Sequence, residues 1–391
     1  MARAIASLLL LISLPALAAT VPAPRDVDIT ALDGVKLKAT YYAADKPGPA
    51  VLLLHMCNSD RKGWDPVGRQ LSAAGINALA LDYRGYGESG GERIDFRKDP
   101  QKLQQVQTDK WPGDEDAAFD YLRAQPGVNK ALIGAGGGSC GVNQAVQVAR
   151  RHSEVRSLVL LAGAPNRAGL DFLQRSAWLP TFTAAAADDE FDPNAPRLMQ
   201  WLSELSGNPR NMFVGFQDGK HGTEIFGPHP ELPRQIVAWY VDTLVKAPAD
   251  PMARVATRKT NASEFWALLS QPDGVARAVR MFHEVRSVDP HAYLFPEFVL
   301  NLAAYERLQA KQTKDAVELF QVNTEAYPNS ANAYDSLGDG YLADGQKEKA
   351  IQASQKALEL LPADKSIPEP FKKLVQQSAE GKLEKLKGTA Q

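Results

Sequence analysis

Residues 137–141 read Gly-Gly-Ser-Cys-Gly and carry the pattern G-x-S-x-G. A mainly apolar run, Val128–Ile133, precedes this pattern, and Val142–Arg151 follows it with helical spacing. A sharp turn between a strand and a helix strains the central residue, and flanking glycines let strand and helix approach closely. The stretch therefore predicts a strand–turn–helix unit with Ser139 at the N-terminus of a helix, where negative charge is favoured.

Other interpretations of the same turn are weaker. The glycines of residues 136–141 also match a dinucleotide-binding fingerprint, which needs a carboxylate after the next strand. The next apolar run, Leu158–Ala162, ends in Gly-Ala-Pro, and the lysine of a phosphate loop is absent. Cys140 is the alternative nucleophile, although Val142 would then occupy the crowded second-glycine position. We take Ser139 as the candidate nucleophile.

A serine nucleophile needs a base, and the base needs an acid that orients it. Residues 180–187 form an apolar run, and Asp-Asp-Glu-Phe-Asp follows at 188–192. A carboxylate just beyond the C-terminal end of a strand lies on the rim where open α/β sheets hold their sites. The register of the run selects Asp189, with Asp188 and Asp192 as alternatives.

The candidate base comes from the histidines that follow Asp189. His221 lies on a glycine-flanked loop after the apolar run Met212–Phe216, and His229 is the alternative base. The six histidines show no H-E-x-x-H pair or comparable ligand spacing, so we expect neither a metal nor a cofactor. We expect Ser139, Asp189 and His221 to meet in one site.

Short apolar runs alternate with amphipathic stretches from Val27 to Val245. This alternation is typical of a mostly parallel sheet that is flanked by helices on both faces. Ala-Pro-Ala-Asp-Pro at 247–251 ends the pattern, and almost everything beyond it has helical spacing. We expect four segments, namely a signal peptide (1–19), an α/β domain (20–247), a linker (248–262) and a helical domain (263–391).

Two further stretches carry a family resemblance. Leu-Leu-Leu-His-Met-Cys at 52–57 resembles the turn after strand three of the α/β-hydrolases, and residues 82–89 are similar to their D-x-R-G-x-G-x-S stretch. With the turn at 137–141, these motifs resemble the α/β-hydrolase superfamily, most like its dienelactone-hydrolase branch. Two positions depart from the family pattern. Met56 replaces a glycine, and Ser139 replaces the cysteine nucleophile of the dienelactone hydrolases.

The resemblance implies acyl transfer to water through an acyl-enzyme on Ser139. The oxyanion hole would be formed by the backbone N–H of Cys140 and that of Cys57 or Met56. Both turns border that hole in the family, so Cys57 and Cys140 should be close neighbours, either as a disulfide or as two buried thiols. The loop at 85–112 and the helical domain are the segments expected to cover the cleft.

The C-terminal segment resembles tetratricopeptide repeats. Residues 327–341 carry the match, and prolines at positions 290, 328 and 362 are spaced by 38 and 34 residues, near the 34-residue period of this repeat. The resemblance implies an all-α repeat domain that could bind a protein partner. So short an array cannot bury its own faces, and we expect it to pack on the preceding domain.

Composition and the N-terminus narrow the function classes. The 391 residues include 44 Lys and Arg against 46 Asp and Glu, so there is no basic excess for nucleic acid. Residues 1–19 combine Arg3, an apolar run and an Ala-x-Ala site, as secretory signal peptides do. No other stretch approaches about 18 apolar residues, so no membrane span is expected after cleavage. We expect a secreted or periplasmic protein.

Together these patterns predict an exported serine hydrolase that cleaves a small-molecule ester or related acyl bond. The alternative function is an interaction scaffold that binds a protein partner through its repeats after losing activity. Met56 favours this alternative, and the ordered trio of Ser139, Asp189 and His221 favours the enzyme.

Overall fold

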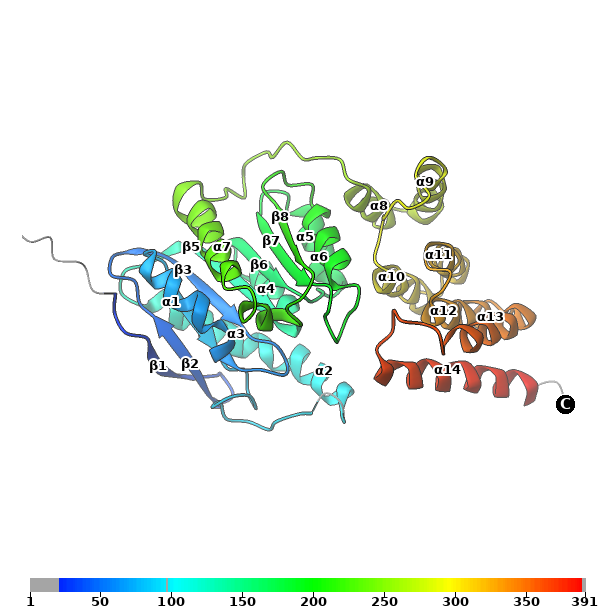
Figure 1. The fold of residues 1–391 in the computed structure, drawn as a ribbon, viewed down its shortest axis with the longest axis horizontal. Helices are drawn as coiled ribbons and strands as arrows, with labels where there is room; N and C mark the ends of the chain where they lie inside the picture. Colours follow the sequence, from blue (N-terminus) through cyan, green and yellow to red (C-terminus); the bar gives the residue numbers. More distant parts are fainter. Residues whose placement is uncertain (1–20, 96–97, 389–391) are drawn as a thin grey trace, which may run out of the picture.

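The structure, a computed structural model, describes residues 21–95 and 98–388. The predicted signal peptide at 1–19 lies outside these ranges. Figure 1 shows a sheet domain followed by an all-helical region. Residues 247–260 connect the two and form neither helix nor strand.

Eight strands form one sheet in the order β1-β2-β4-β3-β5-β6-β7-β8. The strands are β1 Arg25–Thr30, β2 Lys36–Tyr42, β3 Gly48–Leu54, β4 Asn77–Leu81, β5 Val128–Gly138, β6 Val155–Leu161, β7 Thr181–Ala186 and β8 Met212–Phe216. The β1–β2 and β2–β4 pairs are antiparallel, and every other pair is parallel. The predicted mostly parallel sheet is therefore confirmed.

Both faces of the sheet are covered because the central strands are apolar on both sides. Side chains alternate along a strand, so Val51 and Leu53 of β3 pack with α1 and α7, whereas Leu52 and Leu54 pack with α3 and α4. The helices of this domain are α1 Asp65–Ala73, α2 Pro100–Asp109, α3 Trp111–Ala124, α4 Cys140–Arg151, α5 Arg167–Arg175, α6 Ala195–Glu204 and α7 Glu231–Tyr240.

The helical region consists of short antiparallel pairs and a longer last helix. Its helices are α8 Asn261–Leu269, α9 Gly274–Val288, α10 Glu297–Gln309, α11 Thr313–Ala326, α12 Ala331–Ala343, α13 Lys347–Leu360 and α14 Glu369–Gly388. The helical region that the sequence predicts is confirmed, and α14 packs along α12 and α13 at its end (Figure 1).

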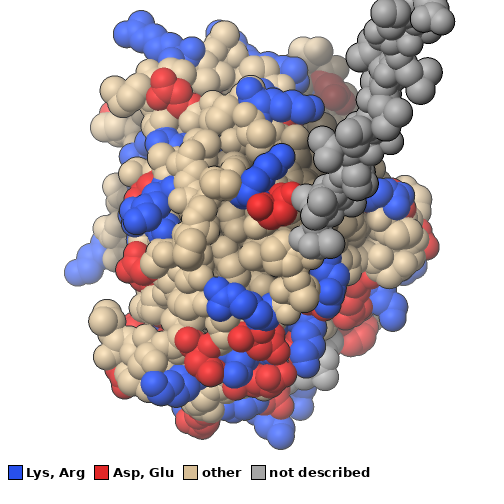
Figure 2. Space-filling view, turned by 90° about the vertical axis from the view of Figure 1, so that its left-hand side faces the viewer, with Lys and Arg blue, Asp and Glu red and all other residues tan. Residues whose placement is uncertain are grey.

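The surface carries mixed charge. Figure 2 shows Lys and Arg interspersed with Asp and Glu over the end of the molecule that holds β1 and β2, without a continuous field of one sign. No helix within the described ranges combines the length and apolarity needed to cross a bilayer.

Two tryptophans join the helical region to the sheet domain. Trp201 of α6 and Trp266 of α8 are fully buried against each other, with ring centroids 5.9 Å apart. The Trp266 indole N–H donates to the Asp171 carboxylate at 3.0 Å, and the Trp201 indole N–H donates to the Leu294 carbonyl at 2.8 Å. The helical region thus packs on the sheet domain through buried side chains of both.

Trp266→Ala should destabilise the whole chain. The change removes a buried indole and leaves a cavity at the junction, which typically costs about 3–5 kcal/mol. We expect the midpoint of urea unfolding, followed by circular dichroism, to fall clearly. Val288→Ala is the matched control because Val288, at the end of α9, is 87% exposed. Equal midpoints for the two variants would contradict the shared core.

Candidate active site

The turn at Ser139 connects the end of β5 to the start of α4. Ser139 has φ 54° and ψ −122°, a strained conformation for a residue with a side chain. A Cβ on Gly137 would lie 1.9 Å from the Gly141 carbonyl oxygen, and a Cβ on Gly141 would lie 2.5 Å from that of Leu54. Both glycines are therefore required by the close approach of β5, α4 and β3, as the sequence predicts.

The predicted acid and base meet at the neighbouring strand ends. Asp189 follows β7 and His221 follows β8, and both side chains are buried. His221 Nδ1 lies 2.7 Å from Asp189 Oδ2, while Asp189 Oδ1 accepts the N–H groups of Phe191 and Asp192 at 2.9 and 3.0 Å. The carboxylate is thus fully partnered, and it favours the His221 tautomer with the proton on Nδ1 and the lone pair on Nε2.

His221 and Ser139 face the same space. A Cβ on Gly222, the next residue, would lie 3.8 Å from the Ser139 nitrogen. Both Ser139 and His221 line one pocket of about 770 Å³. A histidine and a serine that border one pocket are the pair that activates a hydroxyl nucleophile in acyl-transfer enzymes.

The alternative residues take other positions. The Asp188 carboxylate accepts the Lys220 N–H at 2.8 Å and so fixes the start of the His221 loop. Asp192 lines the pocket, and burial raises the pKa of its carboxyl. His229 Nε2 lies 3.0 Å from the Asp218 carbonyl oxygen, and its Nδ1 lies 3.0 Å from the Glu231 carboxylate.

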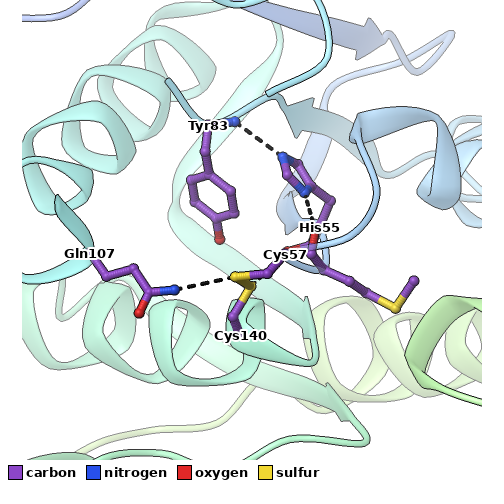
Figure 3. The surroundings of a disulfide bond; sticks show 6 residues. His55, Cys57, Tyr83, Gln107 and Cys140 are labelled. Carbon is purple, nitrogen blue, oxygen red and sulfur yellow. Dashed lines mark hydrogen bonds between the residues drawn. A yellow bond between two sulfur atoms is a disulfide. The ribbon is translucent and has the colours of Figure 1, made fainter. Parts of the chain in front are cut away.

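The candidate oxyanion turn is tied to the nucleophile turn by a disulfide. Cys57 and Cys140 are bonded, with Cα atoms 5.8 Å apart, although 83 positions separate them in the chain. Figure 3 shows the bond beside Gln107 of α2, whose side-chain N–H donates to the Cys57 sulfur at 3.2 Å. Of the two arrangements that the sequence leaves open, the structure contains the disulfide.

The predicted oxyanion donors are the backbone N–H of Cys140 and that of Cys57 or Met56. Cys140 is the first residue of α4, so its N–H is one of the donors that have no partner within the helix. The Met56 side chain is buried between the turns, and its sulfur lies 3.4 Å from the Thr223 nitrogen. Met56 thus fills the space beneath the His221 loop and leaves the pocket side of the turn to Cys57.

His55 is a supporting residue whose role sequence reasoning missed. The fully buried ring has Nδ1 2.6 Å from the Met56 carbonyl oxygen, and its Nε2 accepts the Tyr83 N–H at 3.2 Å (Figure 3). Burial lowers the pKa of His55 to about 4, so the ring is neutral. It joins the turn after β3 to the turn after β4.

The pocket has walls from both parts of the chain. The sheet domain contributes Cys57, Ser139 and His221, and the helical region contributes side chains of α10 and α14. Among the residues described, no cluster of three or more His, Cys, Asp or Glu side chains could hold a metal ion.

Comparisons with known proteins agree with this architecture. Residues 45–196 match the family model described as Serine aminopeptidase, S33. Thiohydrolase aneE of Aspergillus aculeatus is 30% identical over 135 residues, which are 34% of this chain and 40% of that protein. An uncharacterized protein of Mycobacterium tuberculosis is 32% identical over 137 residues, 34% of this chain and 44% of its own length. The matches thus span less than half of these curated relatives.

A solved structure is also similar. The dienelactone hydrolase of Anabaena variabilis aligns over 57% of this chain and 100% of its own, with 18% identity and a TM-score of 0.46. The strand order, the Ser139 turn and the matched family model together define the class. The sheet domain has the α/β-hydrolase fold.

The neutral state of His55 predicts a pH-dependent stability. The folded-state pKa of about 4 lies below the ordinary value of 6.5, so the unfolded chain takes up the proton first as the pH falls. Stability that is present above pH 6.5 is then lost toward pH 4. Between pH 7 and 4 we expect wild type to lose roughly 2–3 kcal/mol more unfolding free energy than His55→Gln.

Urea unfolding of both proteins at the two pH values measures this difference. The comparison cancels the other groups that titrate over the same range, since both proteins share them. Equal losses in wild type and His55→Gln would contradict a buried, neutral His55.

Proposed function

We propose that this protein hydrolyses an ester or related acyl bond of a small molecule through Ser139, His221 and Asp189. The observation that supports the proposal most is the 2.7 Å hydrogen bond between His221 and Asp189. His221 lines the same pocket as Ser139, which has a strained backbone conformation. Esterases and other acyl-transfer enzymes use this set of groups on several folds.

In the proposed reaction, Ser139 Oγ attacks the carbonyl carbon and gives its proton to His221 Nε2. Asp189 stabilises the imidazolium that forms, and the N–H groups of Cys140 and Cys57 hold the oxyanion. The leaving group then takes the proton from His221, and an acyl-enzyme remains on Ser139. Water attacks this ester in a second step, with His221 again as the base, and releases the acid.

The catalytic proposal is tested by activity-based labelling and by kinetics. A fluorophosphonate probe should label wild type and leave Ser139→Ala unlabelled. On p-nitrophenyl acetate, Ser139→Ala and His221→Ala should each lower kcat by on the order of 10⁴ or more, with the double variant little worse, because the two groups act as a unit. Asp189→Asn should be severe but should retain more activity.

His229→Ala is the matched control, since this histidine lies outside the proposed trio and should keep kcat within about twofold. Cys140→Ala tests the alternative nucleophile. If Cys140 were the nucleophile, Cys140→Ala would lose turnover, whereas Ser139→Ala would keep the turnover of wild type and so refute the assignment of Ser139. A wild-type protein that is neither labelled nor active would favour the alternative function, an interaction scaffold. Met56, in place of the glycine at the oxyanion turn of the family, favours that alternative.

We also propose that the protein is exported, to the periplasm or the medium. The signal-like residues 1–19 and the Cys57–Cys140 bond support this location, because disulfides persist in oxidising compartments. Protein purified from the exported fraction should begin after position 19 by mass spectrometry. Denatured without reductant it should titrate no free thiol, and two after reduction. Two free thiols in the unreduced protein would contradict the proposal.

The helical region is proposed to be a tetratricopeptide-like array. Its two central pairs support this, because α10 and α12 each have 13 residues and α11 and α13 each have 14. The starts of α10 and α12 are 34 residues apart, as are those of α11 and α13, which equals the repeat period. A protein partner bound by the outer surface of these helices belongs to the same proposal.

A further inference from the structure

Exposed apolar side chains gather at one place on the helical region. Phe298 of α10 is 39% exposed, and Phe371 and Leu374 of α14 are 53% and 59% exposed. All three line the pocket that holds Ser139. Large apolar groups left in water at the mouth of a site are typical of surfaces that a ligand covers.

Further apolar side chains line the same pocket. The buried Val375 of α14 and Ile367 of the preceding loop extend the lining from the helical region, and Leu103 of α2 adds an apolar side chain from the sheet domain. Figure 1 shows the N-terminal end of α14 beside α2. The helical region therefore supplies part of the apolar lining of the pocket that also contains Ser139.

The α14 part of this lining is fixed by buried charge. Lys382 of α14 is almost fully buried and donates to Asp339 at 2.8 Å, with Asp335 at 2.9 Å. Asp364, in the loop before α14, accepts the Ala331 N–H at 2.7 Å. Removing one partner of such a buried pair is costly, so α14 holds its place on α12 while its first turn points into the pocket.

Polar groups of the pocket lie near His221. Asp192 lines the pocket three residues after Asp189, the hydrogen-bond partner of His221, and burial raises the pKa of the Asp192 carboxyl. On the other side, α2 contacts the oxyanion turn through Gln107 and Cys57. The apolar channel of α2 and α14 thus lies on the oxyanion side of Ser139.

The arrangement of polar and apolar groups indicates where each half of an ester would lie. The leaving group takes its proton from His221, so it lies near His221 and the polar groups beside it. The acyl group then lies along the apolar side chains of α2 and α14. We propose that the helical region forms the acyl-binding channel, and that the substrates are esters of apolar acyl chains of medium length. The inference rests on the proposed function and names its substrate class.

The test uses p-nitrophenyl acetate, butyrate and octanoate, which share one leaving group. Burial of each added methylene strengthens binding by about fourfold. We expect kcat/KM of wild type to rise by at least tenfold from acetate to octanoate. Phe371→Asp and Leu374→Asp should each lower kcat/KM for octanoate by at least fivefold and leave that for acetate within about twofold.

Val288→Asp is the matched control, because it places the same charge on an exposed apolar residue of the helical region outside the pocket. Leu374→Ser repeats the test without a charge, and circular dichroism verifies folding of each variant. Equal losses on acetate and octanoate, losses in the Val288→Asp control, or the absence of a chain-length preference would overturn the channel. Wild type without Ser139-dependent acetate hydrolysis would instead overturn the proposed function.

Discussion

The close approach of β5, α4 and β3 is the constraint on which the rest of the site depends. A Cβ on Gly137 would lie 1.9 Å from the Gly141 oxygen, so only this sequence of glycines lets the chain turn there. The turn forces Ser139 to a φ of 54°, a strain that costs of order 1–3 kcal/mol. The Ser139 N–H offsets part of it by donating to the Leu161 carbonyl at 2.8 Å. The central strands of the sheet thus hold Ser139, in a strained backbone conformation, at the pocket.

The other parts of the site are held by pairs of contacts between neighbouring turns. Asp188 binds the Lys220 N–H while Asp189 binds the His221 ring, so adjacent carboxylates fix both the backbone and the side chain of one loop. On the opposite side, the disulfide of Cys57 holds the turn after β3 to the start of α4. Catalytic groups need positions fixed to a fraction of an ångström, and these contacts restrain both turns beside the pocket.

The sequence predicts a residue's place best where that place follows from local geometry. Asp189 and His221 each come just after an apolar run, and parallel strands bring such positions to one edge of the sheet. The hydrogen bond between these two side chains agrees with that expectation, whereas their role with Ser139 in catalysis stays a prediction. The sequence could not decide between a disulfide and two thiols, because the answer depends on how two turns 83 positions apart converge. The sequence also predicts a loop over residues 85–112. In the structure, α2 occupies Pro100–Asp109 of this stretch, and its Leu103 lines the pocket.

The position of the helical region could not be predicted from the sequence. A spacing of 34 residues predicts paired helices, but it does not predict which of their faces is covered. Trp201 and Trp266 pack together where the helical region meets the sheet domain, and Phe298 and the first turn of α14 line the pocket that contains Ser139. Ligand pockets are common where two domains meet, because neither surface alone is concave enough to exclude water. The helical region forms one wall of the pocket at Ser139, so changes in its docking would alter the shape of the pocket before they altered the turn that holds Ser139.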